Sequence, residues 1–282
     1  MNFKKWEKDP VERQHTQFYK YFLGLNRRAP NVVARNETGR LPLKLNIFLR
    51  IIKFWIHLES LPENSIAKQC LIISNQLANE AKSSFMLTVN EIIHNYTDIQ
   101  KQSNNKTIQN NNMTTIKNNL QKIKYRISNH LKRHQLELIH SNKKLCFYSV
   151  FKTDVSKSDY LEQVKNMKHR RAVAKLRSGN HSLRIETGRH CVPKLPESLR
   201  ICQFCHSNQI ENENHFLFHC DRYNTIRQQV TSEIVLKYPS FDLLNDIDKT
   251  IFLFNNVDSF ICKKLGYFIY EALHIRETCN IL

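Results

Sequence analysis

The sequence contains little glycine or proline, with 5 Gly and 7 Pro in 282 residues. Because both residues favour turns and interrupt regular structure, their scarcity favours long helices over a turn-rich β protein. Long apolar runs are missing too, so we expect no membrane-spanning segment and no membrane partner. Residues 1–14 lack the apolar stretch of a signal peptide. We therefore expect an intracellular protein, in the nucleus or the cytoplasm.

Motifs that mark common enzymes are also missing. The sequence has no GxxxxGK[ST] phosphate loop, no GxSxG elbow and no HExxH zinc motif. The Tyr-x-Asp-Asp element of polymerases is absent as well. No nucleophile, general acid or general base can be assigned, so we expect no enzyme activity from this chain alone.

The charge of the chain is strongly positive and unevenly distributed. The formal net charge is +18. Residues 99–200 hold 22 Lys and Arg against 6 Asp and Glu, whereas residues 201–282 hold 7 against 10. A concentrated positive field attracts polyanions and speeds their encounter with the protein. An acidic protein surface would respond to the same field.

Four residues with metal-ligating side chains follow the basic block. They are Cys202, Cys205, His215 and Cys220. Three thiolates and one imidazole fill the tetrahedral shell of Zn²⁺ and leave no position for water, which indicates a structural rather than a catalytic ion. His206 and His219 are nearby alternative ligands. The competing interpretation is a set of buried cysteines beside an ordinary histidine.

Basic residues just before this motif are candidates for contact with nucleic acid. They are Lys168, Arg170, Arg171, Lys175, Arg177, Arg184, Arg189 and Arg200. Guanidinium groups fit phosphate oxygens in a bidentate way, and such contacts need no base sequence. Aromatic residues near the motif are candidates for stacking on unpaired bases: Phe204, Phe216, Phe218 and Tyr223. The alternative is a solvated basic helix face and a small aromatic core around the metal.

Apolar periodicity predicts amphipathic helices in the first third of the chain. Residues 43–59 repeat apolar side chains at helical spacing. A second helix is expected to begin at Ser60, with Glu63 completing a capping box and an apolar face that includes Ile66 and Cys70. A third apolar stripe runs from Phe85 to Tyr96.

Further helices are expected in the basic block and at the C-terminus. Residues 120–140 and 159–176 show helical periodicity, the second beginning at an Asp159 cap. The last helix runs from about residue 259 to 276. Strand signals are weak, although the turn at Cys202–Cys205 is compatible with a short hairpin. We predict a mainly α fold, made of helical segments with a small zinc-stabilised module near the C-terminus.

The composition also predicts where the chain divides. Residues 101–119 are rich in Asn and poor in large apolar groups, which is typical of a linker. The expected segments are a helical N-terminal part at 1–98, an Asn-rich linker at 99–120, a basic helical region at 121–200, a zinc-binding module with its following helix at 201–235, and a C-terminal helical segment at 236–282.

The tetrapeptide Glu-Thr-Gly-Arg occurs twice, at Glu37–Arg40 and at Glu186–Arg189. In each copy we expect the glycine to end a helix in the left-handed conformation, with Glu and Arg paired across the turn. The flanking sequences do not match, so two similar helix ends are expected rather than a duplicated domain.

Together these residues resemble the C-terminal region of non-LTR (LINE-type) retrotransposon reverse transcriptases. The resemblance is carried by KLRSGNHSLRIETGRH at Lys175–His190, followed by LRICQFC, IENENHFLFHC and YNTIR, and by FYKYFLGLNRRAPNVVARNETGRLPL at Phe18–Leu43. It covers most of the chain except the Asn-rich tract. In this family the zinc-binding pattern follows the Ile-Glu-x-Gly-Arg element, as here.

The resemblance implies a function without catalysis. The endonuclease and the polymerase core, with the carboxylates that bind Mg²⁺, have no counterpart in this sequence. The chain is thus expected to be a non-catalytic, RNA- or DNA-binding fragment that works beside other parts of a reverse transcriptase complex. The alternative is a zinc-stabilised scaffold that binds a protein and no nucleic acid.

Overall fold

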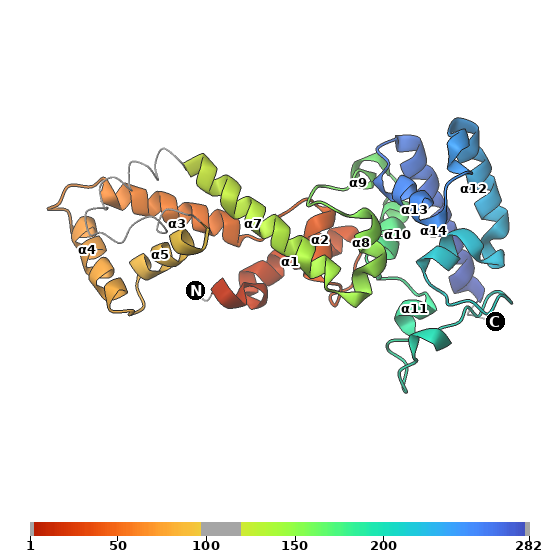
Figure 1. The fold of residues 1–282 in the computed structure, drawn as a ribbon, viewed down its shortest axis with the longest axis horizontal. Helices are drawn as coiled ribbons and strands as arrows, with labels where there is room; N and C mark the ends of the chain where they lie inside the picture. The colour runs from red at the N-terminus through yellow and green to blue at the C-terminus, as the bar shows by residue number, and fades with distance from the viewer. Residues whose placement is uncertain (1–2, 97–119, 280–282) are drawn as a thin grey trace. The chain divides into compact units, whose positions relative to one another are not determined.

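The computed structural model describes residues 3–96 and 120–279 (Figure 1). Over these two ranges the regular elements are helices. Two isolated antiparallel β-bridges are also present, one between Thr38 and Lys157 and one between Ile201 and Ile210. This confirms the predicted mainly α fold class. None of the described helices combines the length and the apolar character that crossing a membrane requires.

The chain forms two compact units that interleave along the sequence. The first combines residues 1–12 with 41–134, and the second combines 13–40 with 135–282. The segments predicted from composition ran consecutively, so this division differs from them. Residues 99–119 of the predicted linker lie outside the described residues, and Leu120 begins a helix.

The first unit is built from amphipathic helices around one apolar core. Its elements are the 3₁₀ helix η1 (Phe3–Lys8), the first residues of α1 (Pro10–Leu23), α3 (Lys44–Glu59), α4 (Ile66–Asn79), α5 (Phe85–Tyr96) and most of α7 (Leu120–His140). Phe48, Ile52 and Trp55 of α3 are buried in this core, as the apolar stripe predicted. Val89 and Ile92 of α5 are buried beside them, which confirms the stripe of the third predicted helix.

The predicted start and inner face of α4 are wrong. The Ser60 amide bonds to carbonyls of the last turn of α3, and α4 begins after Ser65, whose Oγ accepts from the Lys68 amide at 3.3 Å. Pro62 lies between the two helices, and the residue before a proline disfavours helical backbone. Ile66, expected inward, is 84% exposed. The inner face instead carries Lys68 and Leu71, and Lys68 Nζ contacts the Glu59 carboxylate at 2.6 Å.

The second unit contains the remaining elements. They are the rest of α1, α2 (Asn31–Glu37), the end of α7, η3 (Lys143–Leu145), α8 (Cys146–Phe151), α9 (Tyr160–Gln163), α10 (Met167–Arg177), α11 (Arg184–Thr187), η4 (Glu197–Leu199), the π-helical turn η5 (His215–His219), η6 (Asp221–Tyr223), α12 (Asn224–Lys237), η7 (Pro239–Phe241), α13 (Asp246–Asn255) and α14 (Ser259–Cys279). Helix α14 lies at the centre and packs against α9, α10, α12 and α13. Its predicted inner residues, such as Ile261, Phe268 and Ile269, are buried.

The helix predicted at 159–176 is two helices. The backbone of Val164 is extended between α9 and α10, and the Asn166 side chain accepts from the Lys168 amide at 2.9 Å. Asp159 makes no side-chain cap. Because an asparagine N-cap satisfies a free amide of a new first turn, the chain restarts at Met167 instead of continuing one helix.

Candidate metal centre

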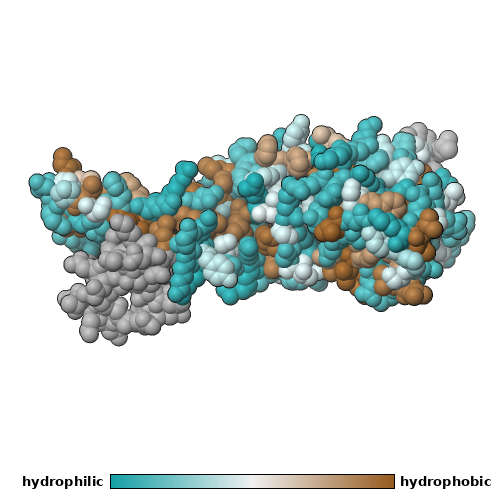
Figure 2. Space-filling view, turned by 90° about the horizontal axis from the view of Figure 1, so that it is seen from above, coloured by the Kyte–Doolittle hydropathy of each residue, from teal (hydrophilic) through white to brown (hydrophobic). Residues whose placement is uncertain are grey.

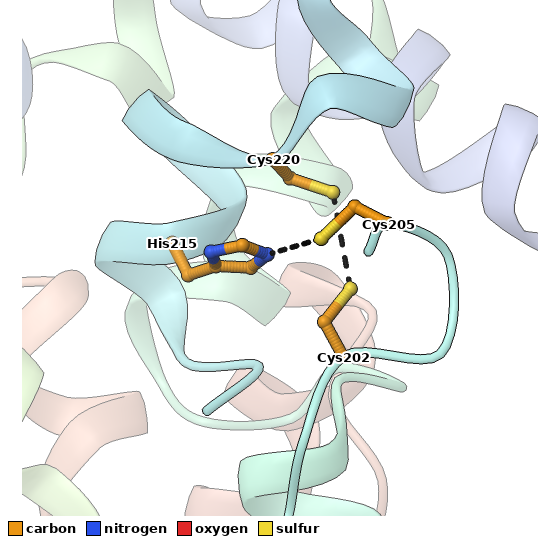
Figure 3. A group of neighbouring side chains, drawn as sticks. All are labelled: Cys202, Cys205, His215 and Cys220. Atoms are coloured by element: carbon orange, nitrogen blue, oxygen red, sulfur yellow. Dashed lines mark hydrogen bonds between the residues drawn. The ribbon is translucent and has the colours of Figure 1, made fainter. Parts of the chain in front are cut away.

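The four predicted ligands lie together in the second unit. Their ligating atoms all lie within 4.8 Å of one another, and Figure 3 shows the four side chains converging on one point. Cys202 Sγ is 3.9 Å from Cys220 Sγ, and Cys205 Sγ is 3.3 Å from His215 Nε2.

These separations fit a tetrahedral metal shell. A tetrahedron with zinc–sulfur bonds of about 2.3 Å has sulfur–sulfur edges of about 3.8 Å, and its sulfur–nitrogen edges are about 3.6 Å. The Cys202–Cys220 separation of 3.9 Å and the Cys205–His215 separation of 3.3 Å lie close to these values. The donor set of three sulfurs and one imidazole is typical of a closed zinc site.

Two local structures bring the ligands together. A short hairpin carries Cys202 and Cys205: the Ile201–Ile210 bridge closes it, and the Cys202 amide donates to the Gln209 carbonyl at 2.8 Å. The π-helical turn η5 supplies His215, and Cys220 follows directly, with its amide bonded to the His215 carbonyl at 2.8 Å. The structure therefore contains a short hairpin at the Cys202–Cys205 turn, with which the sequence was compatible.

The side chain of Gln209 orients the His215 ring. His215 Nδ1 lies 2.9 Å from Gln209 Oε1. Because an amide oxygen only accepts, the ring proton is assigned to Nδ1, and the Nε2 lone pair faces the three sulfurs. Metal-binding histidines commonly bond through their second nitrogen in this way. Gln209 was not among the predicted site residues, and only its position in the hairpin marks it.

The hydrogen bond between the Cys202 and Cys220 thiols shifts their pKa values in opposite directions. The hydrogen bond from the Cys220 thiol lowers the pKa of Cys202 to about 3. The same bond, together with burial, raises the pKa of Cys220 far above its ordinary value. The pair thus shares one proton, with the thiolate on Cys202. A cation at this point would replace the shared proton and stabilise all three thiolates.

Ion pairs tie the hairpin to the last helix. Arg276 of α14 donates to both carboxylate oxygens of Glu211 at 3.0 and 2.9 Å, and both side chains are buried. The Arg276 guanidinium also lies over the Phe204 ring, 4.6 Å from its centre. From helix α12, Arg227 donates to the Cys220 carbonyl at 2.6 Å. These bonds connect the segments that carry the candidate ligands to α12 and α14.

The two alternative histidines are not part of the cluster. His206 is exposed on the hairpin. His219 points elsewhere, with Nε2 2.5 Å from Asp246 Oδ2. Among the described residues, the metal-ligating group formed here is the one predicted from the spacing.

Four of the predicted basic residues lie at the surface of α10. Lys168 and Lys175 are exposed, while Arg170 and Arg171 are half-buried. Arg170 donates to the Leu161 carbonyl at 3.2 Å, which orients its side chain and leaves part of the guanidinium free. The helix contains no Asp or Glu.

Two of the predicted basic residues are excluded from a nucleic-acid surface because they are buried. Arg177 is 2% exposed and is bonded to Glu37, Ser158 and the Phe254 carbonyl. Arg200 is 5% exposed and donates to backbone carbonyls of Ile185 and Leu195. Both guanidinium groups stabilise the fold.

Arg184 and Arg189 occupy an intermediate position. Both are half-buried in and beside α11, and Arg189 pairs with Glu186 at 3.2 Å. The Arg184 amide donates to the Glu211 carboxylate at 2.7 Å, which joins this segment to the hairpin. The Arg184 backbone is thus bonded to the hairpin, and the Arg189 guanidinium is partly occupied by Glu186.

The aromatic residues near the motif mainly form its core. Phe216 and Tyr223 are buried, with ring centres 5.0 Å apart, so neither can stack on a base. Phe204 and Phe218 are half-buried, and Phe204 is covered by Arg276. The prediction of base stacking is therefore wrong for Phe216 and Tyr223, because both rings are buried in the apolar core.

No family model, no curated protein and no solved structure matches this chain. The function must therefore be inferred from the residues and their geometry. The observations that bear on it are the cluster of four candidate ligands, the buried bonds around it and the basic surface of α10.

Proposed function

We propose that this chain binds RNA or DNA through basic side chains of the second unit, next to a structural Zn²⁺ centre held by Cys202, Cys205, His215 and Cys220. The ion stabilises the hairpin and has no catalytic part. The observation that carries the proposal is the exposure of Lys168 and Lys175 on a helix without carboxylates. Such a surface attracts phosphates and has no internal counter-charge.

The sequence resemblance supports the same proposal. We propose that the chain is a non-catalytic C-terminal part of a LINE-type reverse transcriptase, which acts beside the polymerase and endonuclease parts in the nucleus or the cytoplasm. The four ligands and the Ile-Glu-x-Gly-Arg element at 185–189 carry this resemblance. The bonds that join α11 to the hairpin give that element a structural reason to precede the zinc pattern.

Binding across a salt series tests the proposal. Each phosphate contact releases bound counterions, so the logarithm of the affinity should fall linearly with the logarithm of the salt concentration. The full zinc-loaded chain is titrated into labelled RNA and labelled DNA, with fluorescence anisotropy as the readout. A steep salt dependence supports phosphate binding. Absence of binding at low salt refutes it.

A protein-binding scaffold is the second candidate, and a specific surface favours it. Large apolar side chains are exposed around α12, η7 and α13: Leu236 is 87%, Leu243 is 88% and Ile247 is 57% exposed. Hydrophilic residues cover most of the face shown in Figure 2, with hydrophobic groups between them. If the chain binds no nucleic acid but self-associates or captures a purified partner through this surface, the scaffold is the better account.

A further inference from the structure

Helix α1 presents aromatic side chains to solvent. Phe18, Tyr21 and Phe22 are 65%, 76% and 41% exposed. Their spacing, three and four residues apart, puts them on one face of the helix. A single exposed ring is ordinary, but a group of large rings on one face marks a site that binds something.

Arginine side chains of α10 lie against these rings. The Arg170 guanidinium lies over the Phe22 ring, 5.3 Å from its centre, and that of Arg171 lies 5.9 Å from the centre of the Tyr21 ring. Arg171 also donates to the Tyr21 carbonyl at 3.4 Å. The two helices therefore join aromatic and cationic groups in one continuous surface.

Gly24 makes the close approach of Arg171 possible. Its backbone is left-handed, with φ +71°, and a Cβ at this position would lie 2.7 Å from the Arg171 Cδ. Only glycine tolerates both conditions. The stem of Arg171 thus packs against the end of α1, which fixes the guanidinium beside Tyr21.

The surface carries no negative charge of its own. Neither residues 13–23 nor α10 contains Asp or Glu, and exposed Lys168 lies one turn from Arg171. We call Phe18, Tyr21, Phe22, Lys168, Arg170 and Arg171 the aromatic–basic surface. Rings with a free face accept bases, and the flanking cations accept phosphates.

We infer that the aromatic–basic surface binds single-stranded nucleic acid, with unpaired bases stacked on Tyr21 and Phe22 and phosphates held by Lys168 and Arg171. This inference rests on the proposed function and adds the strand type and the residues that recognise it. Bases within a duplex are already stacked and cannot reach the rings. Stacking tolerates any base, so strand type is recognised rather than base sequence.

The test compares strand types and ring substitutions in the full zinc-loaded chain. Labelled oligo(dT) and oligo(rU) of about 20 nucleotides exceed a typical single-strand site, and a duplex of equal length is the comparison. The variants are Tyr21→Leu and Phe22→Leu, which keep apolar bulk but remove the π face, and Tyr21→Phe, which keeps it. Leu243→Ala is the control, because this residue is 88% exposed and lies outside the surface.

The parent chain should bind single strands more tightly than duplex. Each leucine substitution should weaken single-strand binding by about tenfold, the loss expected for one stacked base. Duplex binding should not change, and Tyr21→Phe and Leu243→Ala should bind like the parent. If the leucine variants bind single strands as the parent does, or lose duplex binding equally, the inference is overturned while salt-dependent binding still supports the proposed function. Absence of all binding by the parent overturns both.

Discussion

Arg177 and Glu37 form a buried ion pair although 140 residues separate them in the chain. Arg177 Nε lies 3.0 Å from each carboxylate oxygen of Glu37, and the two side chains are 1% and 0% exposed. The guanidinium lies 4.5 Å from the centre of the Phe151 ring and also faces Tyr148, Tyr160 and Phe254. A residue predicted to contact phosphates therefore joins α2 to α10 within the second unit.

Arg177→Ala should destabilise the protein strongly. Removing one partner leaves the Glu37 carboxylate buried and uncompensated, which costs about 3–5 kcal/mol. Urea unfolding followed by circular dichroism measures the change. Lys157→Ala is the matched control, since Lys157 pairs with Glu162 at the exposed surface, where ion pairs contribute little. Equal unfolding midpoints for the two variants would contradict the structural role of Arg177.

The metal centre predicts one zinc per chain and a requirement for Cys202. Elemental analysis of the purified protein should find stoichiometric zinc, and Cys202→Ser should lose it together with stability of the hairpin, because metal binding is coupled to folding. Cys70→Ser should keep the metal, since Cys70 is exposed on α4. A purified chain without metal, or a Cys202 variant that retains it, removes the basis for the zinc module.

Replacing Gln209 should weaken metal binding without abolishing it. Gln209→Ala leaves all four ligands in place but removes the acceptor that orients His215. Loss of such an outer partner typically weakens binding by about 10–100-fold. Competition with a zinc chelator measures the affinity, and Gln229→Ala, an exposed position on α12, is the control. An unchanged Gln209→Ala affinity would show that the ring does not need this bond.

The exposed lysines of α10 predict a change in salt dependence. Lys168→Ala and Lys175→Ala should each reduce the slope of log affinity against log salt by about one. The fold should be unaffected, because both side chains are exposed. Anisotropy titrations at several salt concentrations give the slope. Lys249→Ala, in α13, should leave the slope unchanged. Equal effects of all three substitutions would mean that binding depends on the overall positive charge and not on the lysines of α10.

We expect the Asp258 carboxylate to contribute to the stability of the fold in a pH-dependent way. Hydrogen bonds from Lys237 Nζ at 2.6 Å and Tyr238 Oη at 2.5 Å hold its pKa well below the ordinary value of 3.8. A depressed carboxyl pKa stabilises the fold above the unfolded pKa, and this contribution is lost as the pH falls through the folded pKa. Asp258→Asn should therefore lower the melting temperature at neutral pH, and the difference from the parent should shrink below about pH 4. Asp242→Asn, which replaces an exposed carboxylate outside this contact, is the control.

The two Glu-Thr-Gly-Arg copies show how local reasoning succeeds and fails. Gly39 is left-handed, with φ +64°, as expected after a helix. Gly188 is instead helical, with φ −63°. The expected pair forms in the second copy, between Glu186 and Arg189 at 3.2 Å. In the first copy Glu37 pairs with distant Arg177, because a buried partner outcompetes an exposed neighbour.

Local pattern was sufficient wherever burial follows periodicity. The inner faces of α3, α5 and α14 agree with their apolar stripes. The face of α4 does not: its buried residues are Lys68, which pairs with Glu59, and Leu71. The break between α9 and α10 was missed because an Asn cap inside a periodic stretch gives a weak signal.

The sequence by itself determined the helical class, the uneven charge and the identity of the four candidate ligands. These depend on residue type and short spacing, which the chain carries locally. Tertiary structure alone decided which cations are available: it buried Arg177 and Arg200, left Lys168 and Lys175 exposed, and placed Arg170 and Arg171 beside the rings of α1. The reason is physical: a charge is exposed or buried according to partners that lie far away in the sequence, and only folding brings those partners together.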